Sequence, residues 1–339
     1  MPLPDTAPRS APPPAPVFEP ARALLFAIGV GVPTLVALAL ADGAAAMAAA
    51  IGAWNALMTD PRRGLVTRLF AIGFAVLAFS AAGTAGYELR DAPGWAMAIG
   101  AVLVVAAAHV PPNFVYLSIV MKLVPVIVVV IATTTIRGEN LVAAFFAGSV
   151  FATLTALVEQ VVRRQVAPAS DPRKELAELF AGHRNDLAFV VAYTAAAALA
   201  MGCATLLGTG RPAWALLVSL FVMHPVRTQA VSNIFQRVGG TLVGVVVAWM
   251  IVTGVGNPWA LAAIATLCAT LAPAGMKAGQ FTAGVVATVL VLILIDLAFL
   301  AQGGDLPLVK ARLADTLVGA AAALVATVAL DWWRRRAGG

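Results

Sequence analysis

One acidic residue lies deep inside a long apolar stretch of this sequence, where its type and surroundings suit proton transfer. Asp296 falls within the apolar run 290–300. If that run spans a membrane, a carboxylate in it is costly to bury and is a candidate proton carrier. The alternative interpretation is that Asp296 lies at the outer edge of a helix and meets water.

A second acidic residue is spaced to meet a basic one. Arg312 and Asp315 are three residues apart at the start of the last apolar run, 312–333. On a helix, this spacing places both side chains on one face, where they can pair. They are therefore candidates for substrate binding or proton coupling, with a simple interfacial ion pair as the alternative.

Arg237 opens another apolar run, 237–254, and is followed at once by glycines. At a membrane edge, its guanidinium can bind an anion or extend its charge toward water. Gly240 and Gly244 are four apart and predict a face on which a second helix approaches closely. Helix packing with a topology anchor is the alternative to an anion site.

The composition indicates what must position these residues. The chain has 339 residues, of which 61% are hydrophobic and 11% charged, and its mean hydropathy is +0.93. Soluble domains average about 45–50% apolar and about 25% charged residues. The apolar runs are long and unbroken, which favours helices over the alternating strands of a membrane barrel. The fold class is therefore an all-α, polytopic membrane protein.

Twelve apolar segments are long enough, or nearly so, to cross a bilayer. They are 22–41, 43–59, 65–86, 94–110, 114–136, 140–162, 186–207, 212–224, 237–254, 258–273, 279–300 and 312–333. The domain prediction has five parts: a Pro-rich, disordered cytoplasmic tail (1–21), a six-helix half (22–162), a charged linker (163–185), a second six-helix half (186–333) and a basic tail (334–339). Within the linker, residues 171–180 predict a short amphipathic helix at the membrane surface.

The basic residues predict the orientation. The formal net charge is +6, and most Lys and Arg residues fall on the side of the N-terminus. The other side carries only Arg90, Arg137, Arg211, Lys310 and Arg312. Because positive charge stays in the cytoplasm, both termini and the linker are expected there.

The two halves resemble each other weakly. Trp54 precedes Asp60-Pro61 as Trp214 precedes His224-Pro225, and Gly148 and Gly319 each stand fifteen residues before an arginine. Each half has an even number of spans, so both insert in the same orientation. The pattern predicts a parallel duplication, which is common in transporters. Gly319 is expected to serve helix packing.

Other classes of function lack their signatures. The sequence has no phosphate-binding loop ending in Gly-Lys-Ser/Thr and none of the common hydrolase motifs. Three histidines at unsuitable spacing predict no metal site, and we expect no cofactor and no enzymatic activity. The two cysteines lie within apolar segments, which argues against a disulfide.

Two motifs carry a resemblance to a known family. Arg237, Gly240, Thr241 and Gly244 form Arg-x-x-Gly-Thr-x-x-Gly, and a similar motif, Arg-x-x-Asp-Thr-x-x-Gly, comprises Arg312, Asp315, Thr316 and Gly319. Residues 211–331 thereby resemble the integral membrane transporter domain of the fusaric acid resistance family, whose relatives include aromatic carboxylic acid exporters. The resemblance adds Thr241 and Thr316 to the candidate residues, and the N-terminal half carries only a degenerate version.

The resemblance implies proton-coupled efflux of small organic acids, aromatic acids among them, across a bacterial inner membrane. The expected partners are a small organic anion and the lipid bilayer, with a homo-oligomer or a periplasmic adaptor left open and no nucleic acid. The alternative is a non-transporting scaffold or an accessory subunit of an envelope complex. A transporter predicts Arg237, Asp296 or Asp315 facing a polar site between helices, whereas a scaffold predicts small apolar residues there.

Overall fold

The structure is a computed structural model that describes residues 18–40, 42–134, 140–163, 170–209, 211–299 and 307–337, with the backbone alone at 307–309. All regular secondary structure in this part of the chain is helical. The helices are α1 (Pro20–Ala39), α2 (Gly43–Met58), α3 (Leu65–Glu88), α4 (Pro93–Ala108), α5 (Val115–Thr133), α6 (Leu141–Val162), α7 (Pro172–Phe180), α8 (Leu187–Leu206), α9 (Pro212–Val222), α10 (Arg227–Gly254), α11 (Pro258–Ala278), α12 (Gln280–Phe299) and α13 (Pro307–Ala337). Residues 1–17 of the predicted Pro-rich tail lie outside the described residues.

Local sequence sets many of the helix starts. Proline occupies the first turn of α1, α4, α7, α9 and α11, where its missing N–H leaves no hydrogen bond unmade. Asp42, Asp186 and Asn257 accept backbone N–H groups at the starts of α2, α8 and α11. These are ordinary helix caps and account for the agreement between predicted and observed starts.

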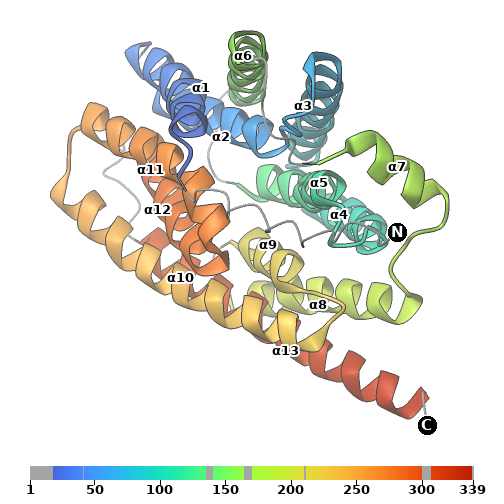
Figure 1. Cartoon of the computed structure of the whole chain (residues 1–339). Coiled ribbons are helices and arrows are strands. Elements are labelled where there is room, and N and C mark those ends of the chain that lie inside the picture. Colours follow the sequence, from blue (N-terminus) through green and yellow to red (C-terminus); the bar gives the residue numbers. More distant parts are fainter. Residues whose placement is uncertain are drawn as a thin grey trace, which may run out of the picture.

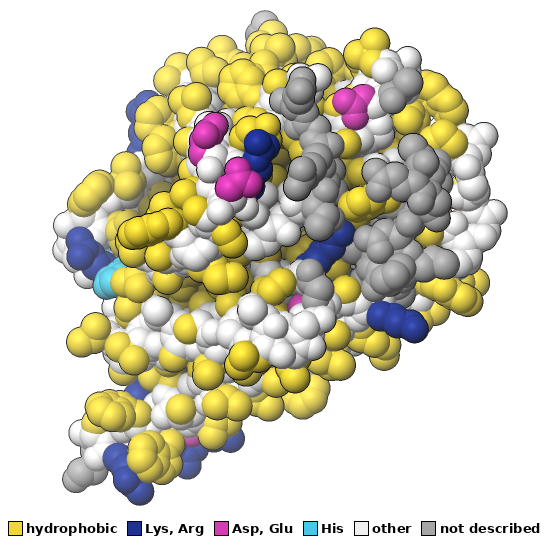
Figure 2. Space-filling model, turned by 180° about the vertical axis from the view of Figure 1, so that it is seen from behind, with side chains coloured by type: hydrophobic (Ala, Val, Ile, Leu, Met, Phe, Trp, Pro, Cys, Tyr) yellow, Lys and Arg dark blue, Asp and Glu magenta, His cyan; other side chains and the backbone are white. Residues whose placement is uncertain are grey.

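Nine of the described helices are long and apolar enough to cross a membrane, and three shorter apolar helices, α2, α4 and α9, accompany them. Hydrophobic side chains cover much of the face in Figure 2, with few charged groups among them. Exposed apolar surface of this extent fits contact with lipid. The chain is therefore a multi-pass membrane protein.

Three helices extend beyond the apolar segments that the sequence indicated. α10 begins at Arg227, ten residues before Arg237, where the apolar run had been taken to start. α11 continues through Pro273 to Ala278, and α13 continues through the predicted basic tail to Ala337. In each case polar residues or a proline were read as a helix end, although neighbouring helices support the continued turn.

The helices pack in a recurring pattern (Figure 1). α2 contacts α1 and α6, while α9 contacts α8 and α13; α5 contacts α3 and α4, while α12 contacts α10 and α11. Contacts between N-terminal and C-terminal helices also occur in corresponding pairs. The contact of α1 with α11 corresponds to that of α8 with α4, and the contact of α2 with α12 corresponds to that of α9 with α5.

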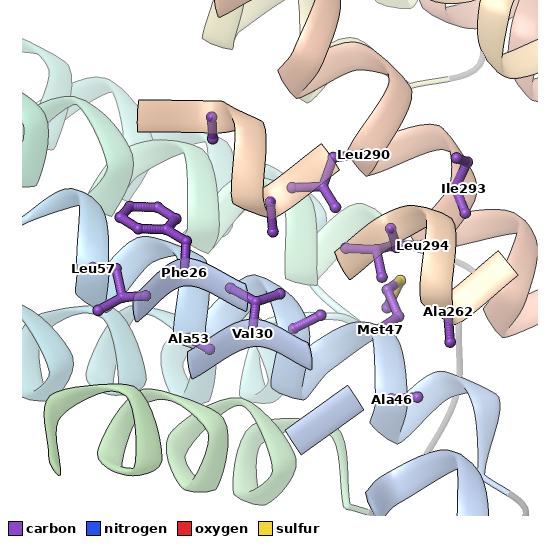
Figure 3. Packing of buried hydrophobic residues seen from close by; sticks show 14 of the residues in the cluster. Phe26, Val30, Ala46, Met47, Ala53, Leu57, Ala262, Leu290, Ile293 and Leu294 are labelled. Atoms are coloured by element: carbon purple, nitrogen blue, oxygen red, sulfur yellow. The ribbon is translucent and has the colours of Figure 1, made fainter. Parts of the chain in front are cut away.

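The largest hydrophobic cluster joins helices that are distant in the sequence. Figure 3 shows Phe26 and Val30 of α1 and Leu57 of α2 in the same packing as Leu290 and Leu294 of α12. All five are buried. The N-terminal and C-terminal helices therefore share one core, which fixes the polar residues of both relative to each other.

A short linker helix, α7, docks on the start of α5. The buried carboxylate of Glu175 accepts the backbone N–H of Tyr116 at 3.3 Å and that of Leu117 at 2.9 Å. Burial raises the pKa of Glu175, and the hydrogen bonds from these N–H groups oppose that rise. The linker is thus attached to the helix bundle through a helix cap supplied from another segment.

Candidate functional site

Arg237 lies inside α10 rather than at its start. Ten residues separate it from Arg227, which corresponds to roughly 15 Å along the helix axis. Its side chain is buried, and Thr241, one turn further, is completely buried. Arg237 therefore does not open its helix, because the polar residues that precede it are helical and partly packed.

Arg312, Asp315 and Thr316 are also buried, near the start of α13. Thr316 donates its hydroxyl to the carbonyl of Arg312 at 2.8 Å, within the helix. The carboxylate of Asp315 accepts the hydroxyl of Thr209 and the backbone N–H of Arg211, at the start of α9. The hydrogen bonds to Asp315 thus come from the segment before α9, whereas Arg312 acts on it through its charge.

The guanidinium of Arg312 lies on an aromatic ring. It is 4.8 Å from the centroid of Trp214, and Arg211 approaches the same ring at 5.5 Å. Within the described residues, no ion pair joins Arg312 to Asp315, so the expected pair on one helix face is absent there. In the sequence, Trp214 served only as a marker of the repeat. The nearby Arg211, three residues before Trp214, was the one sequence feature that could have indicated an arginine–aromatic contact.

Polar atoms without hydrogen-bond partners gather on α10, α12 and α13. Among the described residues they include Arg237 Nε, Thr241 Oγ1, Thr288 Oγ1, Arg312 Nε and Asp315 Oδ2. Arg237 and Arg312 are close enough to interact electrostatically. Buried polar atoms are nearly always paired, so a cluster of unpaired ones in one region indicates a place for a ligand or water.

Glycines allow these helices to approach closely. A Cβ at Gly244 would lie 2.8 Å from Thr288 Cβ, and one at Gly240 would overlap the carbonyl oxygen of Phe281. Gly319 of α13 meets the backbone of α9 in the same way, at the carbonyl oxygen of Ala215. The three glycines thus lie at contacts that bring α12 and α9 against the motif-bearing helices.

Asp296 lies on a different helix from the other acidic candidate. It is buried in the last turn of α12, and the carbonyl oxygen of its neighbour Leu297 lies against Gly43 at the start of α2. Arg312 and Asp315, on α13, instead contact Trp214 and Thr209.

A second buried charged group lies in the N-terminal helices. Asp60 pairs with Arg22 at 2.5 Å and with Arg68 through two hydrogen bonds, Nε to Oδ1 at 2.8 Å and Nη2 to Oδ2 at 2.5 Å. Arg68 also pairs with Glu159 at 2.7 Å. In the sequence, Asp60 served only as a marker of the internal repeat, because its partner Arg22 lies thirty-eight residues away.

Charge is balanced in this second group. Burial by itself raises the pKa of Asp60, but the hydrogen bonds from Arg68 and the charges of Arg22 and Arg68 outweigh it, so the pKa lies below its usual value. Two arginines, Arg22 and Arg68, face two carboxylates, Asp60 and Glu159. A saturated network of this kind stabilises structure and leaves little capacity for a ligand.

The C-terminal cluster differs in charge. Arg237 and Arg312 are both buried, and among the described residues neither forms an ion pair. Two buried like charges are unfavourable unless an anion accompanies them. The geometry therefore suits binding of a small anion between α10 and α13.

The apolar helices are those of a multi-pass membrane protein, and the match to a family model indicates the transporter type. The model of the fusaric acid resistance protein-like family matches residues 186–326, a stretch that includes both Arg-containing motifs. The resemblance expected from those motifs is thereby confirmed. No curated protein and no solved structure matches the chain.

Proposed function

We propose that this chain exports small organic anions across a membrane, with Arg237 and Arg312 binding the anion. The observation that carries the proposal is the pair of buried guanidinium groups on α10 and α13, each with an Nε that has no partner in the described structure. A carboxylate offers two acceptor oxygens for such donors. It would also offset the repulsion between the two arginines.

The proposed architecture is twelve spans in two parallel six-helix halves, α1–α6 and α8–α13. The recurring helix contacts support it: each contact among α1–α6 has a counterpart among α8–α13, and the contacts between halves occur in matching pairs. Gly148 on α6 and Gly319 on α13 support it further, because each approaches the backbone of the second helix of its own half. Transport would then proceed by movement of one half against the other.

The proposed location is a bacterial inner membrane with both termini in the cytoplasm. The distribution of basic residues supports this orientation. In it, α10 begins at the cytoplasmic side and α13 at the opposite side. Arg237 and Arg312 would then stand at successive depths, and an anion leaving the cytoplasm would meet Arg237 first.

We propose Asp315 as the proton carrier, with Asp296 as the second candidate. Asp315 interacts electrostatically with Arg312, and its Oδ2 has no partner among the described residues. Protonation of Asp315 would leave Arg312 free to bind the substrate carboxylate. The proton and the anion would then leave together in an electroneutral step, which a higher concentration of the anion inside the cell would drive outward. Aromatic acids as the substrate class rest on the family resemblance.

A non-transporting scaffold is the competing function. It predicts only small apolar residues between the packed helices, whereas α10, α12 and α13 carry several buried polar atoms without partners. This observation favours transport. A homo-oligomer and a periplasmic adaptor remain proposals for partners.

The proposal is tested by exchange of labelled benzoate in proteoliposomes that contain the full chain. Protein-free liposomes give the passive leak. Arg312→Gln and Arg237→Gln are each expected to abolish the protein-dependent flux, while Arg335→Gln, at an exposed position of α13, retains it. Equal fluxes in all three variants would overturn the assignment of the site.

A further inference from the structure

A pocket lies at one end of the bundle, between N-terminal and C-terminal helices. Its apolar wall includes Met58 at the end of α2, Ile119 of α5 and Met276 of α11. Arg62, in the α2–α3 loop, and Lys277, at the end of α11, provide cationic groups beside this wall. An apolar wall beside cationic groups suits a ligand with an apolar body and a negative charge.

The one carboxylate that lines this pocket, Asp60, is already saturated. Its Oδ1 accepts from Arg68 Nε and from the backbone N–H of Arg62 at 3.0 Å, and its Oδ2 accepts from Arg22 and Arg68. Arg22 and Arg68 therefore neutralise the charge of Asp60, so Asp60 does not neutralise the positive charge of Arg62.

Arg62 has unusual features for a loop arginine. Its Nε is buried without a hydrogen-bond partner in the described structure, although Nη1 reaches Glu19 at 3.0 Å. It is the one non-glycine residue in the described chain with positive φ, at 52°. Conformations of this kind occur at ligand sites, where the surrounding structure holds the backbone in place.

The carboxylate of Glu19 occupies the place beside Arg62 and Lys277 where a ligand carboxylate would bind. It pairs with Arg62 and with Lys277, which come from different halves, and caps no helix with its side chain. The hydrogen bond from Lys277 lowers the pKa of Glu19, so it is ionised at neutral pH. Its contacts are those that a free carboxylate would make with the same two cations.

We propose that this pocket binds an organic carboxylate as it enters from the cytoplasm, and that the carboxylate replaces Glu19 on Arg62 and Lys277. The inference rests on the proposed function and names a second site for the same substrate. The apolar body of the ligand packs on Met58, Ile119 and Met276. Since Lys277 belongs to the C-terminal half and Arg62 to the N-terminal half, the ligand contacts both halves at once.

The site predicts opposite effects of two substitutions. Arg62→Gly removes the charge and suits the positive φ, so folding is retained. It is expected to raise the KM for benzoate about tenfold, as expected for loss of one charged contact. Glu19→Gln removes the competing carboxylate and is expected to lower KM a fewfold. In both variants kcat stays close to that of the original protein.

The measurement uses inside-out vesicles that contain the full chain, with benzoate added on the cytoplasmic side. Lys174→Gln, at an exposed position of α7, is the matched control and leaves KM unchanged. Benzyl alcohol, the neutral analogue, does not compete with benzoate. Unfolding temperatures of the purified variants confirm that they remain folded.

Two results separate this inference from the proposed function. Saturable flux that Arg312→Gln abolishes, with KM unchanged in Arg62→Gly and Glu19→Gln, overturns the pocket alone. Absence of saturable benzoate flux in the unaltered protein overturns both. A rise of KM in Glu19→Gln also contradicts the pocket, because Glu19 would then support binding rather than compete with it.

Discussion

The guanidinium of Arg312 lies 4.8 Å from the ring centroid of Trp214, on the contact between α13 and α9. Both side chains are buried. The ring positions the cation without neutralising it, because an aromatic face carries no net charge. Arg312 therefore remains able to bind an anion, which a direct ion pair with Asp315 would prevent.

Removal of the Trp214 ring tests this relationship. A buried cation–π contact contributes about 2 kcal/mol, so Trp214→Leu is expected to reduce kcat/KM for benzoate by up to about thirtyfold. Trp214→Phe retains a ring and is expected to keep most of the activity. The exchange assay in proteoliposomes measures both, and equal loss in the two variants would show that size, not the aromatic face, is required.

Asp315→Asn tests the proton carrier. The amide keeps the size of the side chain but cannot carry a proton between the two sides. The variant is expected to exchange benzoate for benzoate while losing accumulation driven by a pH gradient. Asp296→Asn is the comparison. Should Asp296→Asn alone abolish driven accumulation, Asp296 rather than Asp315 would carry the proton.

Asp60→Asn tests the charge network of the N-terminal helices. Removal of one partner from a buried ionic network costs about 3–5 kcal/mol, so the unfolding temperature is expected to fall sharply. The pKa of Asp60 is lower in the folded state, so its contribution is present above the unfolded pKa of about 3.9 and is lost as pH falls through the folded value.

The acid dependence gives the network its own readout. Between pH 6 and pH 3, thermal unfolding of the original protein should move to lower temperature by more than that of Asp60→Asn, measured in detergent. Parallel shifts in the two proteins would mean that Asp60 titrates alike in the folded and unfolded states.

Paired glycine substitutions test the repeated packing. A Cβ at Gly148 would overlap the carbonyl oxygen of Ala49, and one at Gly319 that of Ala215. Gly148→Ala and Gly319→Ala are each expected to destabilise the protein by about 1–3 kcal/mol. Gly202 has no neighbour within 4 Å of an added Cβ, so Gly202→Ala should leave the unfolding temperature unchanged or slightly raised.

Agreement of the first two values and a neutral Gly202→Ala would support equivalent packing in the two proposed halves. A neutral Gly148→Ala beside a destabilising Gly319→Ala would instead limit the close contact to the family-related half.

The sequence by itself determined the membrane class and the positions of most helices. Apolar runs near the length of a bilayer, with prolines and capping residues at their starts, require only local information. The two Arg-containing motifs also sufficed for the family, because they lie on single helices and keep their spacing whatever the fold.

Only the tertiary structure decided which polar groups meet. Arg68 finds Glu159 ninety-one residues away, and Asp315 finds Thr209 across one hundred and six residues. The spacing along one helix predicted that Arg312 would pair with Asp315. Packing against α9 and the residues before it instead brings Arg312 onto the Trp214 ring, and Asp315 accepts a hydrogen bond from Thr209. Contacts of this length depend on how helices pack, which the spacing of residues along one helix does not specify.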